Sequence, residues 1–214
     1  MATTPDLERL RDLMQRHCFQ YGDFTLRSGR KSTYYYNGKR VTLRPSAAAL
    51  IGEALVDVVL ASGAEAVGGP ESGAVPIAMA IGLASLSRGR DLPVFVVREK
   101  EKAHGARDRV AEPYAGEGEG APREAPLLAP GRRVAVVEDA ITTGGAVQMA
   151  LDAVEALGCR VLLVAVLVER HEGGGDALRA KGYDVLALFR TDEQGHLSIT
   201  EAFTDRLAAA AAAH

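Results

Sequence analysis

The chain has 214 residues but no tryptophan, only two cysteines and no long hydrophobic run. Cys18 and Cys159 stand far apart and match no metal-binding spacing, so we expect free thiols in a reducing compartment. No apolar stretch approaches the roughly 18 residues that a transmembrane helix needs. Residues 1–10 are charged and lack the apolar segment of a secretion signal. These absences predict a cytoplasmic protein with no membrane partner.

The charge of the chain is nearly balanced, with 25 Lys and Arg against 28 Asp and Glu and a formal net charge of −3. Obligatory nucleic-acid binding is not expected, because such binding depends on neutralising phosphates. An apolar content of 47% and a charged content of 25% are typical of globular proteins. The length suffices for one α/β domain with a full hydrophobic core.

Apolar strands and helical patterns alternate from Ala66 onward. The strands are continuous apolar runs, which is typical of a parallel sheet covered on both faces. We therefore predict an α/β fold with a twisted, mainly parallel sheet flanked by helices. The expected strands span residues 66–69, 93–97, 133–138, 160–168 and 184–189, and the expected helices span 75–87, 145–157 and 176–181.

The N-terminal part differs from this alternating core. Residues 1–44 are expected to form a first helix, capped at Thr4, and a small β-rich hood. Residues 45–214 are expected to form the α/β core, which opens with a helix at Pro45, and the whole is one compact domain. The low-complexity tail Ala208–Ala213 is expected to fray.

The segment RVAVVEDAITTGG, residues 133–145, combines an apolar strand, two adjacent acids and a small-residue turn before a helix. The turn N–H groups, the hydroxyls of Thr142 and Thr143 and the positive end of the helix dipole can bind a phosphate. Glu138 and Asp139 would repel that phosphate, but they suit the neighbouring sugar hydroxyls or a hydrated magnesium ion. The plainer alternative is the polar end of a buried strand with an ordinary turn. Ligand binding is favoured because open α/β sheets bind ligands at the carboxyl ends of strands.

A second glycine-rich turn, Gly68–Gly73, follows the strand 66–69 and precedes a helix. Three glycines in six residues indicate unusual dihedral angles or close approach to a ligand. Main-chain N–H groups around Glu71 and Ser72 can bind a pyrophosphate. An ordinary βα turn is the alternative.

The segment 99–130 is rich in Gly, Pro and charge and has no clear periodicity. A loop of this length is typical of a functional or disordered segment. Basic residues recur at every second position near its start, which places them on one side of an extended chain: Arg98, Lys100, Lys102 and His104. We expect a mobile loop, residues 98–130, whose basic edge encloses a polyphosphate. A solvated hairpin is the alternative.

Two further features suit a planar anionic ligand. Residues 21–36 hold four of the six tyrosines and three basic residues, which can stack on a base and pair with its carboxylate. An amphipathic hairpin with half-buried tyrosines is the plainer alternative. Arg170 follows the strand 160–168, where its guanidinium can hold a planar substrate through two hydrogen bonds. A surface charge is equally compatible with that position.

Together these segments resemble those of the type I phosphoribosyltransferases and, among them, the orotate phosphoribosyltransferases. VAVVEDAITTGG resembles the motif that binds phosphoribosyl pyrophosphate (PRPP), GGPESGAVPIA the pyrophosphate loop, and VVREKEKAHG the mobile catalytic loop. YGDFTLRSGRKSTYYYN resembles the hood of the orotate enzymes, and LVER resembles the segment with an orotate-contacting arginine. The resemblance runs from about Tyr21 to Arg170, with the segments in the expected order.

The resemblance implies a type I phosphoribosyltransferase-like fold and a role for each matching residue. The implied catalytic residues are Arg98, Lys102, His104 and Asp139. The implied PRPP site adds Glu71, Ser72, Glu138, Ala140, Ile141, Thr142, Thr143, Gly144, Gly145 and Ala146. The implied orotate site comprises Arg27, Tyr35, Tyr36, Thr142 and Arg170. Magnesium is carried by PRPP without direct side-chain ligands, and a homodimer shares its active sites.

The chain departs from the family pattern at several points. Arg27 replaces a common lysine, which keeps the charge but not its geometry. Gly73 stands where the family often has a lysine, and Glu99 interrupts a common Arg-Lys pair. Residues 107–130 form a longer insertion than the family leads us to expect.

The expected activity is that of a pentosyltransferase. It transfers 5-phosphoribosyl from PRPP to orotate with Mg²⁺ and gives orotidine 5′-phosphate and pyrophosphate, in pyrimidine (UMP) synthesis. Two alternatives remain open: a PRPP-dependent transferase for another nucleobase, and a non-catalytic regulator that senses PRPP. The basic residues at the start of the loop favour an enzyme over a regulator.

Overall fold

The computed structural model describes residues 2–25, 31–99, 109–113 and 126–212. Within these ranges one sheet has seven strands in the order β5-β4-β3-β6-β7-β8-β9. Neighbouring strands from β4 to β8 run parallel, and β5 and β9 are antiparallel edges. The strands are β3 (Ala66–Pro70), β4 (Val94–Val97), β5 (Val110–Ala111), β6 (Arg133–Ile141), β7 (Arg160–Glu169), β8 (Val185–Thr191) and β9 (Leu197–Ile199). The predicted α/β class with a mainly parallel sheet is confirmed.

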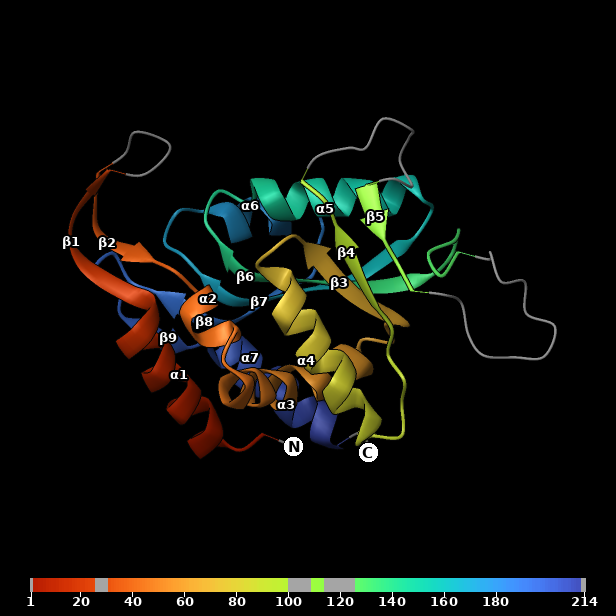
Figure 1. Ribbon diagram of the computed structural model, residues 1–214, viewed down its shortest axis with the longest axis horizontal. Coiled ribbons are helices and arrows are strands. Elements are labelled where there is room, and N and C mark those ends of the chain that lie inside the picture. The colour runs from red at the N-terminus through yellow and green to blue at the C-terminus, as the bar shows by residue number, and fades with distance from the viewer. Residues whose placement is uncertain (1, 26–30, 100–108, 114–125, 213–214) are drawn as a thin grey trace.

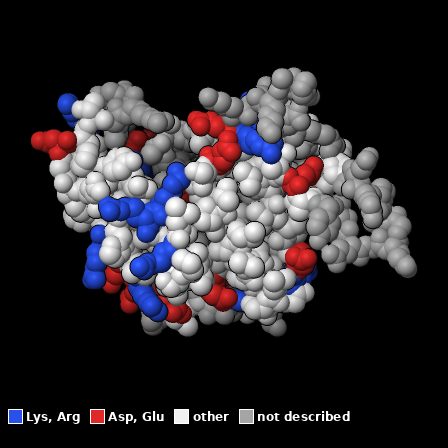
Figure 2. All heavy atoms as spheres, in the orientation of Figure 1, with Lys and Arg blue, Asp and Glu red and all other residues white. Residues whose placement is uncertain are grey.

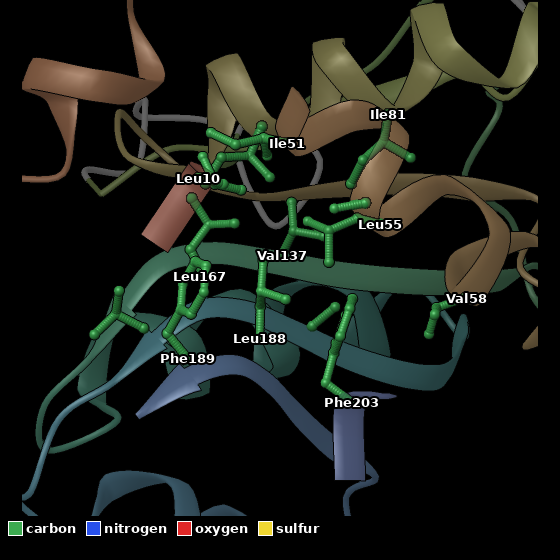
Figure 3. Close-up of a cluster of buried hydrophobic side chains, with 14 of the residues drawn as sticks. Leu10, Ile51, Leu55, Val58, Ile81, Val137, Leu167, Leu188, Phe189 and Phe203 are labelled. Carbon is green, nitrogen blue, oxygen red and sulfur yellow. The ribbon is translucent and has the colours of Figure 1, made fainter. Parts of the chain in front are cut away.

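Helices cover both faces of this sheet (Figure 1). On one face lie α3 (Pro45–Ala61), α4 (Ala74–Leu86) and α7 (Glu201–Ala212), and on the other lie α5 (Gly145–Ala156) and α6 (Gly174–Ala180). Alternate residues of β6 serve the two faces, because side chains along a strand point to opposite sides. Val137 packs with α3 and α4 (Figure 3), whereas Val136 packs with α5. Burial on both faces explains the continuous apolar runs of these strands.

The N-terminal segment shares its core with this α/β body. Helix α1 (Thr4–Cys18) follows Thr3, whose N–H and hydroxyl donate to the Asp6 carboxylate, so the capping residue is Thr3 and not Thr4. Leu10 on α1 packs in the same buried cluster as Ile51 (Figure 3). A separate antiparallel pair, β1 (Phe19–Thr25) and β2 (Lys31–Tyr36), and the short α2 (Lys39–Thr42) complete the hood.

Two sequence predictions about element ends were wrong, and one short strand was not predicted. The strand expected to end at Glu138 continues to Ile141, because Ala140 and Ile141 pair with β7. The segment 99–130 includes β5, which pairs with β4. The tail does not fray over residues 208–212, which belong to α7. That helix buries Phe203, Leu207 and Ala210 against the sheet.

No helix in the described ranges is long and apolar enough to cross a membrane.

Candidate active site

Two adjacent carboxylates mark the carboxyl-terminal part of β6. Glu138 is 6% exposed, and its Oε1 accepts the backbone N–H of Asp139 at 2.9 Å. The strand is held between β3 and β7, which fixes the backbone that carries both acids. Two carboxylates are thus placed by a rigid part of the sheet rather than by a loop.

The environment of this pair disfavours its negative charge. Burial, followed by the nearby Asp139 charge, raises the pKa of Glu138 to about 9. Burial also raises the pKa of Asp139, although the exposed Lys39 favours its charged form. The pair therefore retains a proton near neutral pH. A ligand that offers hydroxyl donors or a cation would relieve the electrostatic cost of this arrangement.

Two glycines give the acids the space they occupy. A Cβ atom at Gly38 would lie 2.8 Å from Oδ2 of Asp139, and one at Gly73 would lie 2.8 Å from Oδ1 of the same residue. Real Cβ atoms do not approach other atoms so closely, so any side chain at position 73 would displace the acids from this arrangement. The departure from the family pattern at Gly73 therefore fits the close packing seen here. Tyr36 completes the enclosure, because its hydroxyl donates to the Asp139 carbonyl at 3.4 Å.

The turn after β6 has the geometry of an anion site. Gly144 caps α5 with a φ of 85°, a left-handed conformation that glycine adopts without strain. The first N–H groups of a helix have no intrahelical partner and are available to a ligand. Thr143, Gly145 and Ala146 are exposed at this helix start, and Thr142 is half-buried. The carbonyl of Thr142 accepts the N–H of Gly174 at 2.9 Å, so α6 supports the turn from behind.

The turn after β3 lies beside the acid pair. Glu71 and Ser72 are exposed and joined by a cis peptide bond, and the following Gly73 caps α4. Oε1 of Glu71 accepts the N–H of Glu99 at 2.9 Å. This hydrogen bond connects the turn after β3 to the start of the segment that follows β4.

A cavity of about 340 Å³ lies at the base of the hood, and Arg170 lines it. The guanidinium lies over the Tyr34 ring, 4.9 Å from its centroid, and Nε donates to the Tyr34 hydroxyl at 3.4 Å. Glu172 pairs with Arg170 at 3.0 Å. The other lining residues are Lys31, Ser32, Thr33, His171 and Glu193. The arginine is 8% exposed, and Tyr34 and Glu172 hold its guanidinium.

The backbone brings the cavity next to the turn Thr142–Gly144, which is called the phosphate-type turn below. The N–H of Arg170 donates to the carbonyl of Ile141 at 2.9 Å, one residue before Thr142. Tyr36 is close enough to sense charges of both regions: burial and the charge of Asp139 raise its pKa well above its ordinary value, whereas the charge of Arg170 acts in the opposite direction. A planar group against Arg170 and a sugar phosphate at the turn would therefore be neighbours.

These arrangements match a known family. The model of the phosphoribosyl transferase domain matches residues 41–186. An orotate phosphoribosyltransferase of Rhodopirellula baltica is 39% identical over 189 residues, covering 86% of this chain and 91% of the relative. One from Bradyrhizobium sp. (strain ORS 278) is 37% identical and covers 90% of this chain and 99% of the relative. The chain belongs to the orotate phosphoribosyltransferase family. The resemblance inferred from the sequence is confirmed.

Solved orotate phosphoribosyltransferases share the fold. The Mycobacterium tuberculosis H37Rv enzyme in complex with Fe(III) dicitrate superposes with a TM-score of 0.72 at 34% identity, covering 89% of this chain and 99% of that one. The structure of that enzyme in complex with PRPP gives a TM-score of 0.69 at 31% identity, with the same coverage of both chains. The predicted fold class, a type I phosphoribosyltransferase-like sheet with an N-terminal hood, is thereby confirmed.

The structure brings together only part of the site expected for an orotate phosphoribosyltransferase. Tyr36 contacts the acid pair, whereas Tyr35 is 43% exposed and packs on Phe24 with ring centroids 5.9 Å apart. Arg98 is half-buried, and its N–H donates to the Arg109 carbonyl at 2.7 Å. Three further predicted residues lie outside the described ranges: Arg27, Lys102 and His104.

Sequence reasoning missed the residues that hold Arg170. Tyr34 is 5% exposed and is the tyrosine that faces the guanidinium. Its hydroxyl lies 3.4 Å from Oγ1 of Thr191, which comes from β8 far along the chain. The two-residue period of a strand places Tyr34 and Tyr36 on one face and Tyr35 on the other. That signal was available in the sequence, but the contribution of Thr191 was not.

Proposed function

We infer that this chain catalyses the transfer of 5-phosphoribosyl from PRPP to orotate, giving orotidine 5′-phosphate and pyrophosphate in the synthesis of pyrimidine nucleotides. The observation that carries this inference is the position of the Arg170 cavity beside the acid pair and turn at the end of β6. An arginine fixed at one end of a cavity suits the carboxylate of a planar base. Family membership points to the same reaction.

We assign the PRPP-binding roles as follows. Glu138 and Asp139 accept hydrogen bonds from the ribose hydroxyls, which supply partners for the buried carboxylates. The 5′-phosphate lies at residues 140–146, where the first main-chain N–H groups of α5 and the hydroxyls of Thr142 and Thr143 can donate to it. Glu71 and Ser72 lie at the pyrophosphate. Two observations support this assignment: the chemistry of each group, and the hydrogen bond from the Arg170 N–H to the Ile141 carbonyl.

We assign the orotate site to Arg170, Tyr36 and Thr142, with Arg27 and Tyr35 as the remaining family positions. Arg170 supplies two donors for the carboxylate. Tyr34, which the sequence did not single out, orients that arginine through the contact of Nε with its hydroxyl. An enzyme that lacks this support would hold the carboxylate less firmly.

Catalysis in this proposal is mainly electrostatic. Breaking the anomeric bond leaves positive charge on the ribose and negative charge on the departing pyrophosphate, so stabilising that separation lowers the barrier. Arg98, Lys102 and His104 neutralise the pyrophosphate. Asp139 lies at the ribose, where its negative charge stabilises the developing cation. No nucleophile on a side chain is needed.

Magnesium fits this site as an ion that enters with its substrate. Two carboxylates at the end of β6 can accept hydrogen bonds from its water shell. Among the described residues, no group of three or more His, Cys, Asp and Glu side chains could hold a metal ion. We propose that Mg²⁺ is bound mainly by PRPP, where it neutralises pyrophosphate charge.

A homodimer with shared active sites is part of the proposal. Helix α4 presents a row of exposed apolar side chains, spaced three or four residues apart: Val75, Met79, Leu83 and Leu86. Figure 2 shows this face, where the region over α4 carries few charges. We expect Leu83→Glu to lower the molecular mass measured by light scattering to that of a monomer. A dimer of unchanged strength in this variant would exclude α4 from the interface.

We also propose that the enzyme works in the cytoplasm. Cys18 and Cys159 are both free and buried, which fits a reducing compartment. Fractionation of the native cells tests this assignment, and recovery in a secreted fraction would contradict it.

The reaction itself is tested by spectrophotometric loss of orotate in the presence of PRPP and Mg²⁺, with uracil, hypoxanthine and adenine in parallel. Turnover of orotate alone is expected, because the other bases lack the carboxylate that Arg170 binds. Turnover of a purine would favour the transferase for another nucleobase. PRPP binding without turnover of any base would favour a regulator.

A further inference from the structure

An ion pair between a half-buried arginine and a buried carboxylate lies behind the phosphate-type turn, Thr142–Gly144, and has no role in the reaction described above. Glu169, the last residue of β7, is 4% exposed. Its two carboxylate oxygens accept hydrogen bonds from Nη1 and Nη2 of Arg179 at 2.7 and 2.8 Å. This is the paired geometry in which arginine binds a carboxylate most strongly. The pair connects the sheet directly to α6.

The Glu169 carboxylate lies close to the turn Thr142–Gly144. Glu169 pairs with Ile141 across the β6–β7 ladder, one residue before Thr142. A Cβ atom at Gly175 would overlap Oε1 of Glu169, so the carboxylate passes directly beneath the start of α6. The pair therefore fixes α6 at the end of the helix that faces the turn.

Helix α6 in turn contacts the turn through its first residue. The N–H of Gly174 donates to the Thr142 carbonyl at 2.9 Å. A Cβ atom at Gly174 would lie 2.6 Å from the Gly144 nitrogen and 2.6 Å from the Thr143 carbonyl carbon. The two backbones thus touch without any intervening side chain. A displacement of α6 would be transmitted directly to the residues that face the phosphate.

We propose that the Glu169–Arg179 pair is a positioning element of the sugar-phosphate site, which holds α6 against the Thr142–Gly144 turn and so sets the affinity for PRPP. The inference rests on the proposed binding of the 5′-phosphate by that turn. Burial alone would raise the pKa of Glu169, but hydrogen bonds from Arg179 and Arg190 hold it below its ordinary value, so the carboxylate is charged.

Arg190 provides Glu169 with a second cationic partner, so Arg179 can be replaced without leaving the carboxylate unpaired. Nη2 of Arg190 lies 3.1 Å from Oε2 of Glu169, and this contact does not involve α6. When Arg179 is replaced, Glu169 therefore keeps one cation, and no unpaired charge is left buried. The variant Arg179→Met should fold while α6 loses its anchor. Arg179→Lys keeps the charge but lacks the two parallel N–H donors of the guanidinium, and it provides a second, milder variant.

The test is the steady-state kinetics of both Arg179 variants, together with the affinity for ribose 5-phosphate measured by calorimetry. A misplacement of about 1 Å can cost about 10²-fold, so a helix that keeps its other contacts should cost roughly tenfold. We expect Arg179→Met to raise KM for PRPP and Kd for ribose 5-phosphate by about that factor. KM for orotate should change less than about twofold, and Arg179→Lys should shift KM for PRPP in the same direction. Unchanged KM for PRPP in folded variants, or equal effects on both substrates, would overturn the proposal.

A matched control separates positioning from stability. Asp57 is 2% exposed and accepts two hydrogen bonds from Arg88, both at 3.0 Å, on the opposite face of the sheet. Asp57→Asn should lower the melting temperature without changing KM for PRPP. If it raised KM for PRPP as much as Arg179→Met does, the effect would be one of general stability and the proposal would fail.

A second comparison separates the positioning role of the ion pair from the assignment of the 5′-phosphate to the turn. The double variant Thr142→Val/Thr143→Val removes both hydroxyls from the turn and should weaken ribose 5-phosphate binding at least about tenfold. If it does not, the phosphate lies elsewhere and both proposals are wrong. If it does and the Arg179 variants do not, only the positioning role is wrong.

Discussion

The buried acid pair predicts an unusual dependence of stability on pH. Glu138 has a folded-state pKa of about 9 against an ordinary value of 4.5, because burial and the Asp139 charge disfavour its ionised form. The folded state therefore binds a proton that the unfolded chain releases above pH 4.5. The stability contributed by this proton is complete below pH 4.5 and is lost as the pH rises toward 9. Glu138→Gln removes the titration while keeping a side chain of the same shape.

The size of the effect follows from the slope rather than from the value of the pKa. One proton bound only in the folded state changes the free energy of unfolding by about 1.4 kcal/mol per pH unit. Between pH 6 and pH 8, wild type should thus lose up to about 2.7 kcal/mol relative to Glu138→Gln. For a chain of 214 residues this corresponds to a relative change in melting temperature of about 5–10 °C.

Urea unfolding of both proteins at pH 6, 7 and 8, without ligands, measures this difference. Asp205→Asn provides the control, because it removes one carboxylate from an exposed position on α7. The control should follow wild type at every pH. The free energy of unfolding of wild type should fall relative to that of Glu138→Gln as the pH rises. If the difference between the two proteins changed by less than about 0.5 kcal/mol between pH 6 and pH 8, the protonated state assigned to Glu138 would be wrong, because one bound proton requires a larger change. The variant should also lose at least about tenfold in kcat/KM for PRPP, because an amide is a weaker acceptor for the ribose hydroxyl.

Three further predictions concern other parts of the chain. Arg170→Lys loses the paired donors and the contact with Tyr34, so KM for orotate should rise about tenfold or more while KM for PRPP stays within about twofold; equal changes in both constants would argue against a role at the base. Gly174→Ala places a methyl 2.6 Å from the Gly144 nitrogen. It should therefore lower the free energy of unfolding in urea by about 1–3 kcal/mol and raise KM for PRPP. If the variant were as stable as wild type, α6 would not be in close contact with the turn. Phe203→Ala empties a fully buried position on α7 and should cost about 3–5 kcal/mol in urea unfolding, whereas a cost below about 1 kcal/mol would mean that α7 is not part of the core.

The parts of the fold that could be predicted are those with local signals. The strand, turn and helix around residues 133–157 are adjacent in the sequence, and their order follows from apolar runs and glycine positions. The acid pair was found in the same way, because two carboxylates at the end of a buried strand have few structural explanations. The parallel sheet followed from strands that are apolar on both faces.

The parts that could not be predicted depend on distant pairing. Strand β5 has two residues and forms only because β4 offers an open edge. The alanine-rich end of α7 has little apolar pattern of its own, yet Ala210 is buried against the body of the protein. The support of Arg170 by Tyr34 joins residues 136 positions apart, and no local pattern indicates such a contact. Long-range contacts of this kind are set by topology rather than by periodicity.

We expect one ligand to span the turn after β6, the acid pair and the Arg170 cavity. A crystal structure with orotidine 5′-phosphate tests it most directly. We expect the phosphate within residues 140–146, the ribose hydroxyls on Glu138 and Asp139, and the carboxylate against Arg170. A phosphate at the turn with the base away from Arg170, or a base in the cavity with the phosphate elsewhere, would contradict it.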